Sequence, residues 1–424
     1  MLVSPGGVST GCGARDAHED PRATARRPPT RGPKAPVAPR ARSTTVEASS
    51  DAAPRSPSAT ASASSPRRSP LTVEADVAMT RVREHLRQVL LRRVDAGDGW
   101  LMAHAVLGLG PHTPWGETQL WEVLLRRHAL ASRDSSRLLF AVDGAGEPVE
   151  PHFGLIAKAL ASGGLSPEAT FRARDGREHA VREVMHPRDA WPKLTSPVER
   201  ANPPDATTTL ASLDDTPWAL EAAARWRTEP PHVLREVASA ALDHLWQLHA
   251  PLRAQRALGA PPQRDGEGVY ALTCGGAHVL QGILVVHGLF PLSDDASQRL
   301  EGLWETTVWR FESELGLLDA SIASAPARRA ALLGQRLKLT GHFLETLHTA
   351  AAAGVGLSDA TRAQTRAARA LAETVATLAV LEQREALLPA ATGQEKARAT
   401  RTLSGDAMHA LHGIELALGA PVFP

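Results

Sequence analysis

Aromatic residues are scarce in this chain of 424 residues and absent from its first part. All seventeen Phe, Trp and Tyr residues follow Pro70, and residues 1–70 are rich in Ala, Pro, Ser, Thr and Arg. Such a composition buries too little apolar surface to offset the entropy lost on ordering. The sequence therefore predicts a disordered tether over residues 1–70 and a single folded domain over residues 71–424.

The net charge of +1 conceals a basic first part. Residues 1–70 carry eleven Lys and Arg against five Asp and Glu, so the rest of the chain is mildly acidic. A basic tail can contact nucleic acid or anionic lipid. These charges are sparse, and no aromatic side chain is present to stack on bases. The pattern favours a solvated spacer over a nucleic-acid-binding arm.

Cysteine and long apolar runs are also scarce. The two cysteines are Cys12 in the tether and Cys274 in the domain, a distribution that does not indicate a structural disulfide. No run reaches the roughly eighteen apolar residues of a membrane span. The sequence contains no phosphate-binding loop, nucleophile elbow or dinucleotide fingerprint, so the enzyme classes built on those motifs are not indicated.

The segment around Cys12 resembles the cleavage region of a bacterial lipoprotein signal, in which the cysteine is lipidated and a flexible linker follows. Gly11 precedes the cysteine, but Ser9 stands where Leu is usual, and residues 1–8 lack a basic start and an apolar core. A start codon assigned too far downstream would account for both departures. The resemblance implies a lipid anchor at Cys12 and a place in the cell envelope. The alternative is an exposed thiol on a cytoplasmic protein.

From Leu71 onward the apolar residues recur three and four apart, as in amphipathic helices. Further helices are expected over residues 117–131, 152–162, 217–226, 231–257, 271–288, 296–319, 327–353, 360–386 and 394–418. Strand signals are confined to two peripheral hairpins that would turn at Asp143-Gly144 and at Asp175-Gly176. The Pro-rich segment 186–215 is expected to be a long loop or a domain boundary. The predicted fold is mostly all-α.

Four of the expected helices contain a similar phrase that begins with histidine. The phrases are His104-Ala-Val-Leu-Gly108, His278-Val-Leu-Gln-Gly282, His342-Phe-Leu-Glu-Thr346 and His409-Ala-Leu-His-Gly413. Residues four apart share a helix face, so the small residue would let a backbone or a ligand approach the imidazole. The recurrence predicts repeated helical hairpins, arranged as an α-solenoid or as a closed α/α toroid with the histidines in a central cavity. Alternatively, each imidazole packs in the core and bonds to a backbone carbonyl.

Two other phrases resemble terpenoid cyclases, which are α/α toroids. The run QRLEGLW at residues 298–304 matches the Q-x3-G-x-W phrase of that family. SLDDTP at residues 212–217 matches most of its D-x-D-D-T acid motif, with Ser212 in place of the leading Asp. The resemblance implies a toroid and, at the acid motif, cyclase chemistry. From the residues alone, Asp214 and Asp215 are expected to cap a helix that begins at residue 217.

Cys274 and His278 lie four residues apart, the spacing of a bidentate metal pair on a helix. Zinc or another divalent metal would need further ligands, for which His104, His342 and His409 are candidates. Without a metal, the Gly-Gly pair after Cys274 could direct backbone N–H groups at an anion, and Cys274 could act as a stabilised thiolate. A buried cysteine beside a packed histidine is the explanation that needs no function.

The C-terminal half also contains two carboxylate-x-x-His pairs on different helices. They are Glu345-Thr-Leu-His348 and Asp406-Ala-Met-His409. Glu312 or Glu314 and Glu373 lie on the two other helices of this half, an order that resembles ferritin-like di-iron bundles. Asp406 departs from that family, which has Glu at the position. The resemblance implies a dinuclear metal site.

Taken together, the patterns predict a cell-envelope protein with a helical, toroid-like domain. Its His-lined centre would bind or process a small carbohydrate, isoprenoid or peptide-like ligand, with assistance from a metal. The competing prediction is a non-catalytic helical scaffold in which the histidines only pack. The two predictions differ in the distances expected among His104, His278, His342 and His409.

Overall fold

The computed structural model describes residues 73–131, 138–140, 148–150, 152–185, 206–264, 268–356, 360–383 and 393–423. The predicted tether over residues 1–70 and Cys12 lie outside these ranges. All of the described residues belong to one compact unit.

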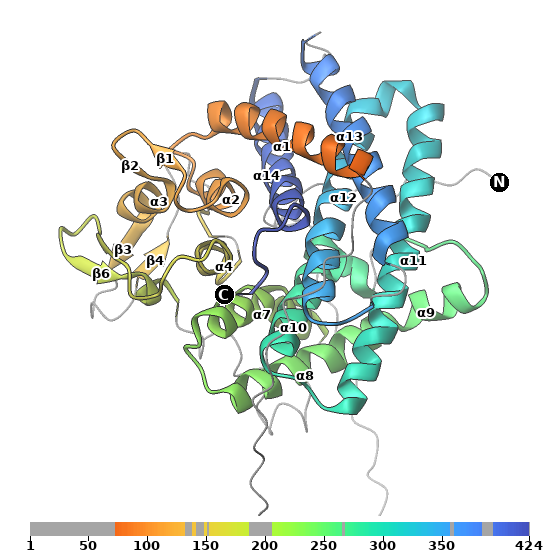
Figure 1. Ribbon diagram of the computed structural model, residues 1–424, viewed down its shortest axis with the longest axis horizontal. Coiled ribbons are helices and arrows are strands. Elements are labelled where there is room, and N and C mark those ends of the chain that lie inside the picture. The colour runs from red at the N-terminus through yellow and green to blue at the C-terminus, as the bar shows by residue number, and fades with distance from the viewer. Residues whose placement is uncertain are drawn as a thin grey trace, which may run out of the picture. The chain divides into compact units, whose positions relative to one another are not determined.

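The described residues form twelve α-helices and three small antiparallel sheets of two strands each (Figure 1). The helices are α1 (Val73–Arg93), α2 (Gly99–Leu109), α3 (Leu120–His128), α4 (Leu155–Ser162), α7 (Ala206–Trp226), α8 (Pro231–Leu248), α9 (Ala250–Ala257), α10 (Ala277–Leu289), α11 (Asp294–Ser324), α12 (Arg329–Ala352), α13 (Ala360–Gln383) and α14 (Gly393–Ala417). The predicted mostly all-α fold is confirmed. None of these helices is both long enough and apolar enough to cross a membrane.

Six helices pack in a closed circle, which we call the inner ring. Around it, α2 packs against α4, α4 against α7, α7 against α10, α10 against α12, α12 against α14, and α14 against α2 (Figure 1). Other helices form a second layer around the inner ring. In this layer α1 contacts α14, α8 contacts α10, and both α11 and α13 contact α12. A closed circle with a second layer is the arrangement expected of an α/α toroid, and an open solenoid would leave α2 and α14 apart.

Glycines let the helices of the inner ring approach each other closely. A Cβ atom on Gly108 would lie 2.7 Å from the backbone oxygen of Met408, and one on Gly282 would lie 3.0 Å from that of Pro217. Gly413 faces the backbone of α12 in the same way. These are the small residues of the histidine phrases, so the predicted close approach is confirmed. In each case the neighbour is a helix of the ring.

The start of α7 differs from the prediction. The helix runs from Ala206 through Pro217 without interruption, so Asp214 and Asp215 lie inside it and the prediction of a cap is wrong. Residues from Thr216 to Ala224 are buried in the ring, and this packing outweighs the local tendency of proline to begin a helix. The last part of the loop expected over residues 186–215 is helical, because α7 begins at Ala206.

The sheets agree with the prediction in part. Strands β5 (Thr170–Arg172) and β6 (Glu178–Ala180) form the expected hairpin, and Gly176 at its turn has a φ of 81°. Strand β4 (Leu138–Phe140) pairs with β3 (Ala129–Ala131), and the expected Asp143-Gly144 turn lies outside the described residues. The hairpin of β1 (Pro114–Trp115) and β2 (Thr118–Gln119) was not predicted; its Gly116-Glu117 turn precedes α3, which begins later than expected.

Candidate metal centre

The four histidines of the repeated phrases lie together inside the inner ring. His104 comes from α2, His278 from α10, His342 from α12 and His409 from α14, and each is at most 4% exposed. The ring centroids of His342 and His409 are 4.2 Å apart, those of His278 and His342 4.8 Å, and those of His104 and His409 5.3 Å. The histidines therefore converge as predicted, although they come from opposite ends of the domain.

Two groups of side chains within the described residues have a geometry that could hold a metal ion. The thiolate group comprises Cys274, His278 and His342, and the carboxylate group comprises His342, Glu345 and His409. In each group one candidate ligand atom from every residue lies within 4.8 Å of the others. Metal bonds of about 2 Å require ligand atoms within about 4 Å of one another. The spacing is thus close to that of a metal site and shorter than that of an open substrate cavity.

Cys274 reaches this cluster from an unusual turn, η4 (Thr273–Gly276), immediately before α10. Cys274, Gly275 and Gly276 have φ angles of 52°, 59° and 76°, so three successive residues are left-handed. This conformation costs a residue with a Cβ atom about 1–2 kcal/mol, whereas glycine adopts it readily. The expectation that Cys274 and His278 share one α-helix is therefore wrong, because Cys274 lies in this turn and α10 begins only at Ala277. The side chains of Cys274 and His278 nevertheless lie close together.

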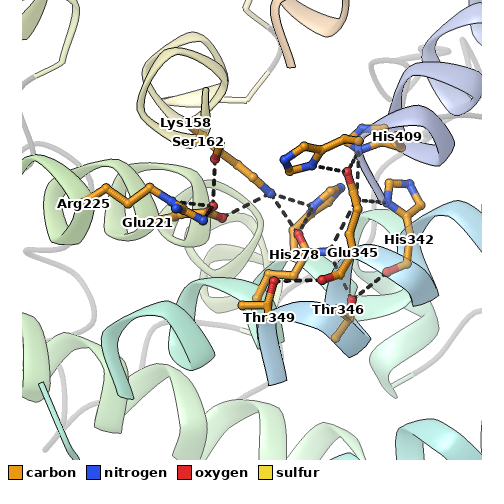
Figure 2. Close-up of polar contacts among 12 residues, drawn as sticks. Lys158, Ser162, Glu221, Arg225, His278, His342, Glu345, Thr346, Thr349 and His409 are labelled. Carbon is orange, nitrogen blue, oxygen red and sulfur yellow. Dashed lines mark hydrogen bonds and ion pairs between the residues drawn. The ribbon is translucent and has the colours of Figure 1, made fainter. Parts of the chain in front are cut away.

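Glu345 accepts hydrogen bonds from three imidazoles at the centre of the cluster (Figure 2). Its carboxylate lies 3.0 Å from Nδ1 of His409, 2.9 Å from Nδ1 of His412 and 3.2 Å from Nδ1 of His342. Because an ionised carboxylate can only accept, each of these Nδ1 atoms acts as the donor. An imidazole that donates through Nδ1 presents Nε2 as its metal-binding atom.

The electrostatic environment keeps Glu345 ionised. Burial by itself raises the pKa of this carboxyl group, but the charge of His409 and the hydrogen bonds from His342, His409 and His412 hold the pKa well below its usual value. The result is a negative charge fixed inside the ring and surrounded by imidazoles. A divalent cation bound among these side chains would be stabilised by that charge.

A second chain of buried polar groups joins the cluster to α4 and α7 (Figure 2). The ammonium group of Lys158 donates to Oε1 of Gln281 at 2.9 Å and lies 3.3 Å from Oε2 of Glu221. Gln281 in turn donates to Oγ1 of Thr346 at 3.1 Å and lies 3.4 Å from Oε2 of Glu345. Nδ1 of His278 lies 3.1 Å from Oε1 of Gln281, so this chain also orients His278.

The charged side chains in this row of buried polar groups compensate one another. Burial raises the pKa of Glu221, but the charges of Lys158 and Arg225 outweigh it and lower the pKa to about 2. Neither Lys158 nor Glu221 was identified from the sequence. Each could have been recognised as the single charged residue in an apolar stretch of helix. Lys158 lies in the run LIAKALAS, and Glu221 lies in an alanine-rich run. Such a residue must find a partner across the core.

His104 differs from the other three histidines. Its Nδ1 atom is 2.8 Å from the backbone oxygen of Trp100, one turn earlier in α2, and it belongs to neither group. This hydrogen bond is the one expected of a histidine that packs in the core. The ring of His104 still contacts that of His409 edge-on, so it supports the cluster from one side.

Asp406 is buried and His348 is half-buried, and neither belongs to either group. Nε2 of His348 lies 3.4 Å from Nε2 of Gln364 on α13, and burial lowers the pKa of His348 to about 4. In the carboxylate group, Glu345 is joined by His342 and by His409 of α14. Of the two expected carboxylate-x-x-His pairs, only Glu345 and His409 therefore belong to a group that could hold a metal ion.

The other carboxylates of the expected di-iron arrangement also have different partners. Arg310 and Tyr270 both donate to Glu314, and the guanidinium of Arg336 donates to Glu373. Glu312 pairs with an exposed arginine of α13. These ion pairs keep the three carboxylates out of both groups, so the described residues do not assemble a ferritin-like carboxylate set.

The two phrases that resemble terpenoid cyclases contribute no residue to either group. Trp304 is buried in α11, where its ring stacks near that of Phe343 and Nε1 donates to the backbone oxygen of Gly356 at 3.3 Å. Asp215 of the second phrase accepts from the backbone N–H of Phe153 at 3.4 Å, before α4. Comparison of the chain with models of protein families, with curated proteins and with solved structures found no match.

Proposed function

We propose that the inner ring holds a zinc ion and that the protein is a metal-dependent enzyme acting on a small ligand. The observation that carries the proposal is the thiolate group, in which Cys274, His278 and His342 bring one sulfur and two imidazoles within 4.8 Å of one another. Thiolate and imidazole are the donors that zinc prefers. Three protein ligands leave one position of a tetrahedral ion open to water or substrate, as in catalytic zinc sites.

The surroundings of the thiolate group support this role. Glu345 accepts a hydrogen bond from Nδ1 of His342, the relation in which a carboxylate orients a metal-bound histidine and increases its basicity. On the other side, Gln281 and Lys158 orient His278. The ion would act as a Lewis acid on a bound water or ligand. The side chains of this chain would hold the ion and exchange protons around it.

Metal analysis of protein purified without a metal-binding tag tests the proposal. We expect about one zinc ion per chain, and loss of that zinc in the variants Cys274→Ser, His278→Ala and His342→Ala. His348→Ala is the matched control, because His348 is a half-buried histidine of the same helix α12 outside both groups. A stably folded wild-type chain without stoichiometric metal would exclude the enzyme proposal and favour the helical scaffold.

Cys274→Ser and one further variant, His409→Ala, locate the ion. The carboxylate group offers a second position, and its ligands His342, Glu345 and His409 include no sulfur. If the ion lies there, Cys274→Ser retains metal and His409→Ala loses it. Replacement by Co²⁺ gives an independent check, since only the thiolate group would produce a sulfur-to-cobalt charge-transfer band.

The proposal extends to a cell-envelope protein anchored through a lipid at Cys12. Its support is the resemblance of the segment around Cys12 to a lipoprotein signal. Incorporation of a labelled fatty acid in the native host, abolished in Cys12→Ser, would support the anchor. Absence of label in the wild-type chain would return the protein to the cytoplasm.

A further inference from the structure

The left-handed turn η4 is held in place by a side chain of α11. Nη1 of Arg310 donates to the backbone oxygen of Gly275 at 2.7 Å. The guanidinium lies so close to this glycine that a Cβ atom there would be 2.2 Å from Nη2 of Arg310. Gly275 is thus needed both for its positive φ and for the space that the guanidinium occupies.

Arg310 is itself fixed by two neighbours. Its Nε atom donates to Oε1 of Glu314 at 2.7 Å, and the hydroxyl of Tyr270 donates to the same oxygen at 2.7 Å. The guanidinium also lies over the ring of Tyr270, with its carbon 4.7 Å from the ring centroid. Glu314 is 2% exposed, so these contacts are formed in a buried environment where they hold a single geometry.

Cys274 needs such support because its own conformation is unfavourable. It is one of two non-glycine residues with positive φ in the described part of the chain, and it lies between Thr273 and the Gly275-Gly276 pair. A residue held in a sparsely populated region persists only where its surroundings enforce it, and such residues cluster at functional sites. If the turn relaxed, Sγ of Cys274 would leave the vicinity of His278 and His342.

We infer that Arg310 is a positioning residue that holds Cys274 in the left-handed conformation and thereby keeps Sγ within reach of His278 and His342. Glu314 and Tyr270 act through Arg310 by fixing its guanidinium. The expected effect on metal binding rests on the proposed function. The conformation of the turn itself can be measured without a metal.

The experiment compares Arg310→Gln and Arg310→Lys in a chain that carries Cys12→Ala, so that Cys274 is the only thiol. We expect Arg310→Gln to weaken zinc binding about 10–100-fold, the usual effect of removing a group that supports a ligand. The charge-transfer band of the Co²⁺ form should weaken with it. Arg310→Lys should recover part of both, because an ammonium can still donate to the carbonyl of Gly275 but cannot also be held by Glu314 in the same geometry.

Arg336→Gln is the matched control. Arg336 is a buried arginine with ion pairs to Asp319 and Glu373, and it belongs to α12. We expect its replacement to lower stability without changing zinc affinity or the cobalt band. Tyr270→Phe, which removes one hydroxyl, should weaken zinc binding less than Arg310→Gln does. Equal zinc affinity and an unchanged cobalt band in Arg310→Gln would overturn the inference while leaving the metal proposal intact.

A structure of the metal-free Arg310→Gln chain provides the readout that does not depend on metal. We expect Cys274 to take a negative φ there, and to keep its positive φ in Arg336→Gln. Retention of the left-handed turn without Arg310 would overturn the inference. If the wild-type chain binds no metal, the proposed function fails, and the conformation of Cys274 in this variant still decides the role of Arg310.

Discussion

At the scale of single residues, one carboxylate organises the centre of this protein. Glu345 is 2% exposed and contacts imidazoles of two helices, His342 on its own helix and His409 and His412 on α14. A buried charge is tolerated when its hydrogen-bonding capacity is filled by good donors. The three Nδ1–H groups meet that condition, and they fix the orientation of the rings that carry them.

Replacing Glu345 with glutamine should therefore lower both stability and metal affinity. The neutral amide has one acceptor oxygen for three Nδ1–H donors and no charge to attract them, so we expect the free energy of unfolding of the metal-free chain to fall by about 3–5 kcal/mol. Urea denaturation in the presence of a chelator measures this change. Glu312→Gln is the control, because Glu312 pairs with Arg362, whose side chain is 70% exposed, and such pairs contribute about 0–1 kcal/mol. Equal losses in the two variants would contradict the central role of Glu345.

Glu150 should make the stability of the protein depend on pH. Burial raises the pKa of Glu150 from 4.5 to about 7. Hydrogen bonds from the backbone of Ile156 and Gly154 oppose this rise. The charge of Asp215 raises the pKa further, and His152 lowers it. The folded state thus favours the protonated form. The stabilisation from this group is complete below pH 4.5 and is lost as the pH rises through about 7.

Glu150→Gln removes this dependence. Relative to the wild-type chain, the variant should gain roughly 3 kcal/mol in the free energy of unfolding between pH 4 and pH 8, from roughly 1.4 kcal/mol for each pKa unit. Urea denaturation across that range gives the measurement, with the exposed Glu168→Gln as a control that keeps the wild-type slope. A constant difference between Glu150→Gln and the wild type at all pH values would show that Glu150 does not titrate in this way.

At the scale of elements, the inner ring depends on positions where one helix backbone touches the next. Gly108 is such a position, because a Cβ atom there would overlap the backbone of Met408 in α14. Gly334 in α12 is also a helical glycine, yet a Cβ atom there would have Leu403 as its nearest neighbour at 3.8 Å, an ordinary contact. The same substitution should therefore have opposite signs at the two sites.

Gly108→Ala is expected to lower the free energy of unfolding by about 1–3 kcal/mol, since α2 and α14 must separate to admit the methyl group. It should also disturb the contact between His104 and His409. Gly334→Ala is expected to raise the free energy of unfolding by about 0.5–1 kcal/mol, because alanine loses less backbone entropy than glycine in a helix. Thermal or urea denaturation of both variants measures the signs, and a loss at Gly334 equal to that at Gly108 would contradict the close-packing argument.

The sequence predicted the elements with local signals and missed those set by tertiary contacts. The histidine phrases and their glycines were identifiable because both fall on one helix face, and the repeat made convergence of the histidines one of two predictions. The start of α7 was not predictable, because the packing of the ring overrides the proline signal at residue 217. The turn at Cys274 and the partners of Lys158 depend on Arg310 and Glu221, which are distant in sequence.

At the scale of the whole folded unit, the ring closes between helices from its two ends. The guanidinium of Arg401 in α14 donates to both carboxylate oxygens of Asp98, at 2.6 Å and 3.0 Å, and Asp98 also caps α2 by accepting from the backbone N–H of Leu101. Two histidines that contact Glu345 also come from α14. The last helix thus completes both the ring and the cluster.

A chain that ends at Gln383 lacks α14 and should not fold cooperatively. It exposes the apolar faces of α2 and α12 and leaves Glu345 without two of its three imidazole donors. Urea unfolding followed by tryptophan fluorescence should give no sharp transition. By contrast, a chain that begins at Leu71 omits only the predicted tether and should unfold like the full chain. A sharp transition in the shorter chain would show that the ring is not the cooperative unit.

The contribution of α14 to the cluster has a consequence for biosynthesis. A ribosome delivers the chain from its N-terminus, so His104, Cys274, His278 and His342 emerge well before His409. Until His409 is made, the nascent chain therefore carries a cysteine and histidines that are not yet held in their final geometry. Glu345 acquires its partners His409 and His412 only after α14 has emerged. Assembly of the centre must therefore wait for α14, and a chain that stalls before this helix would be recognisable by a reactive Cys274.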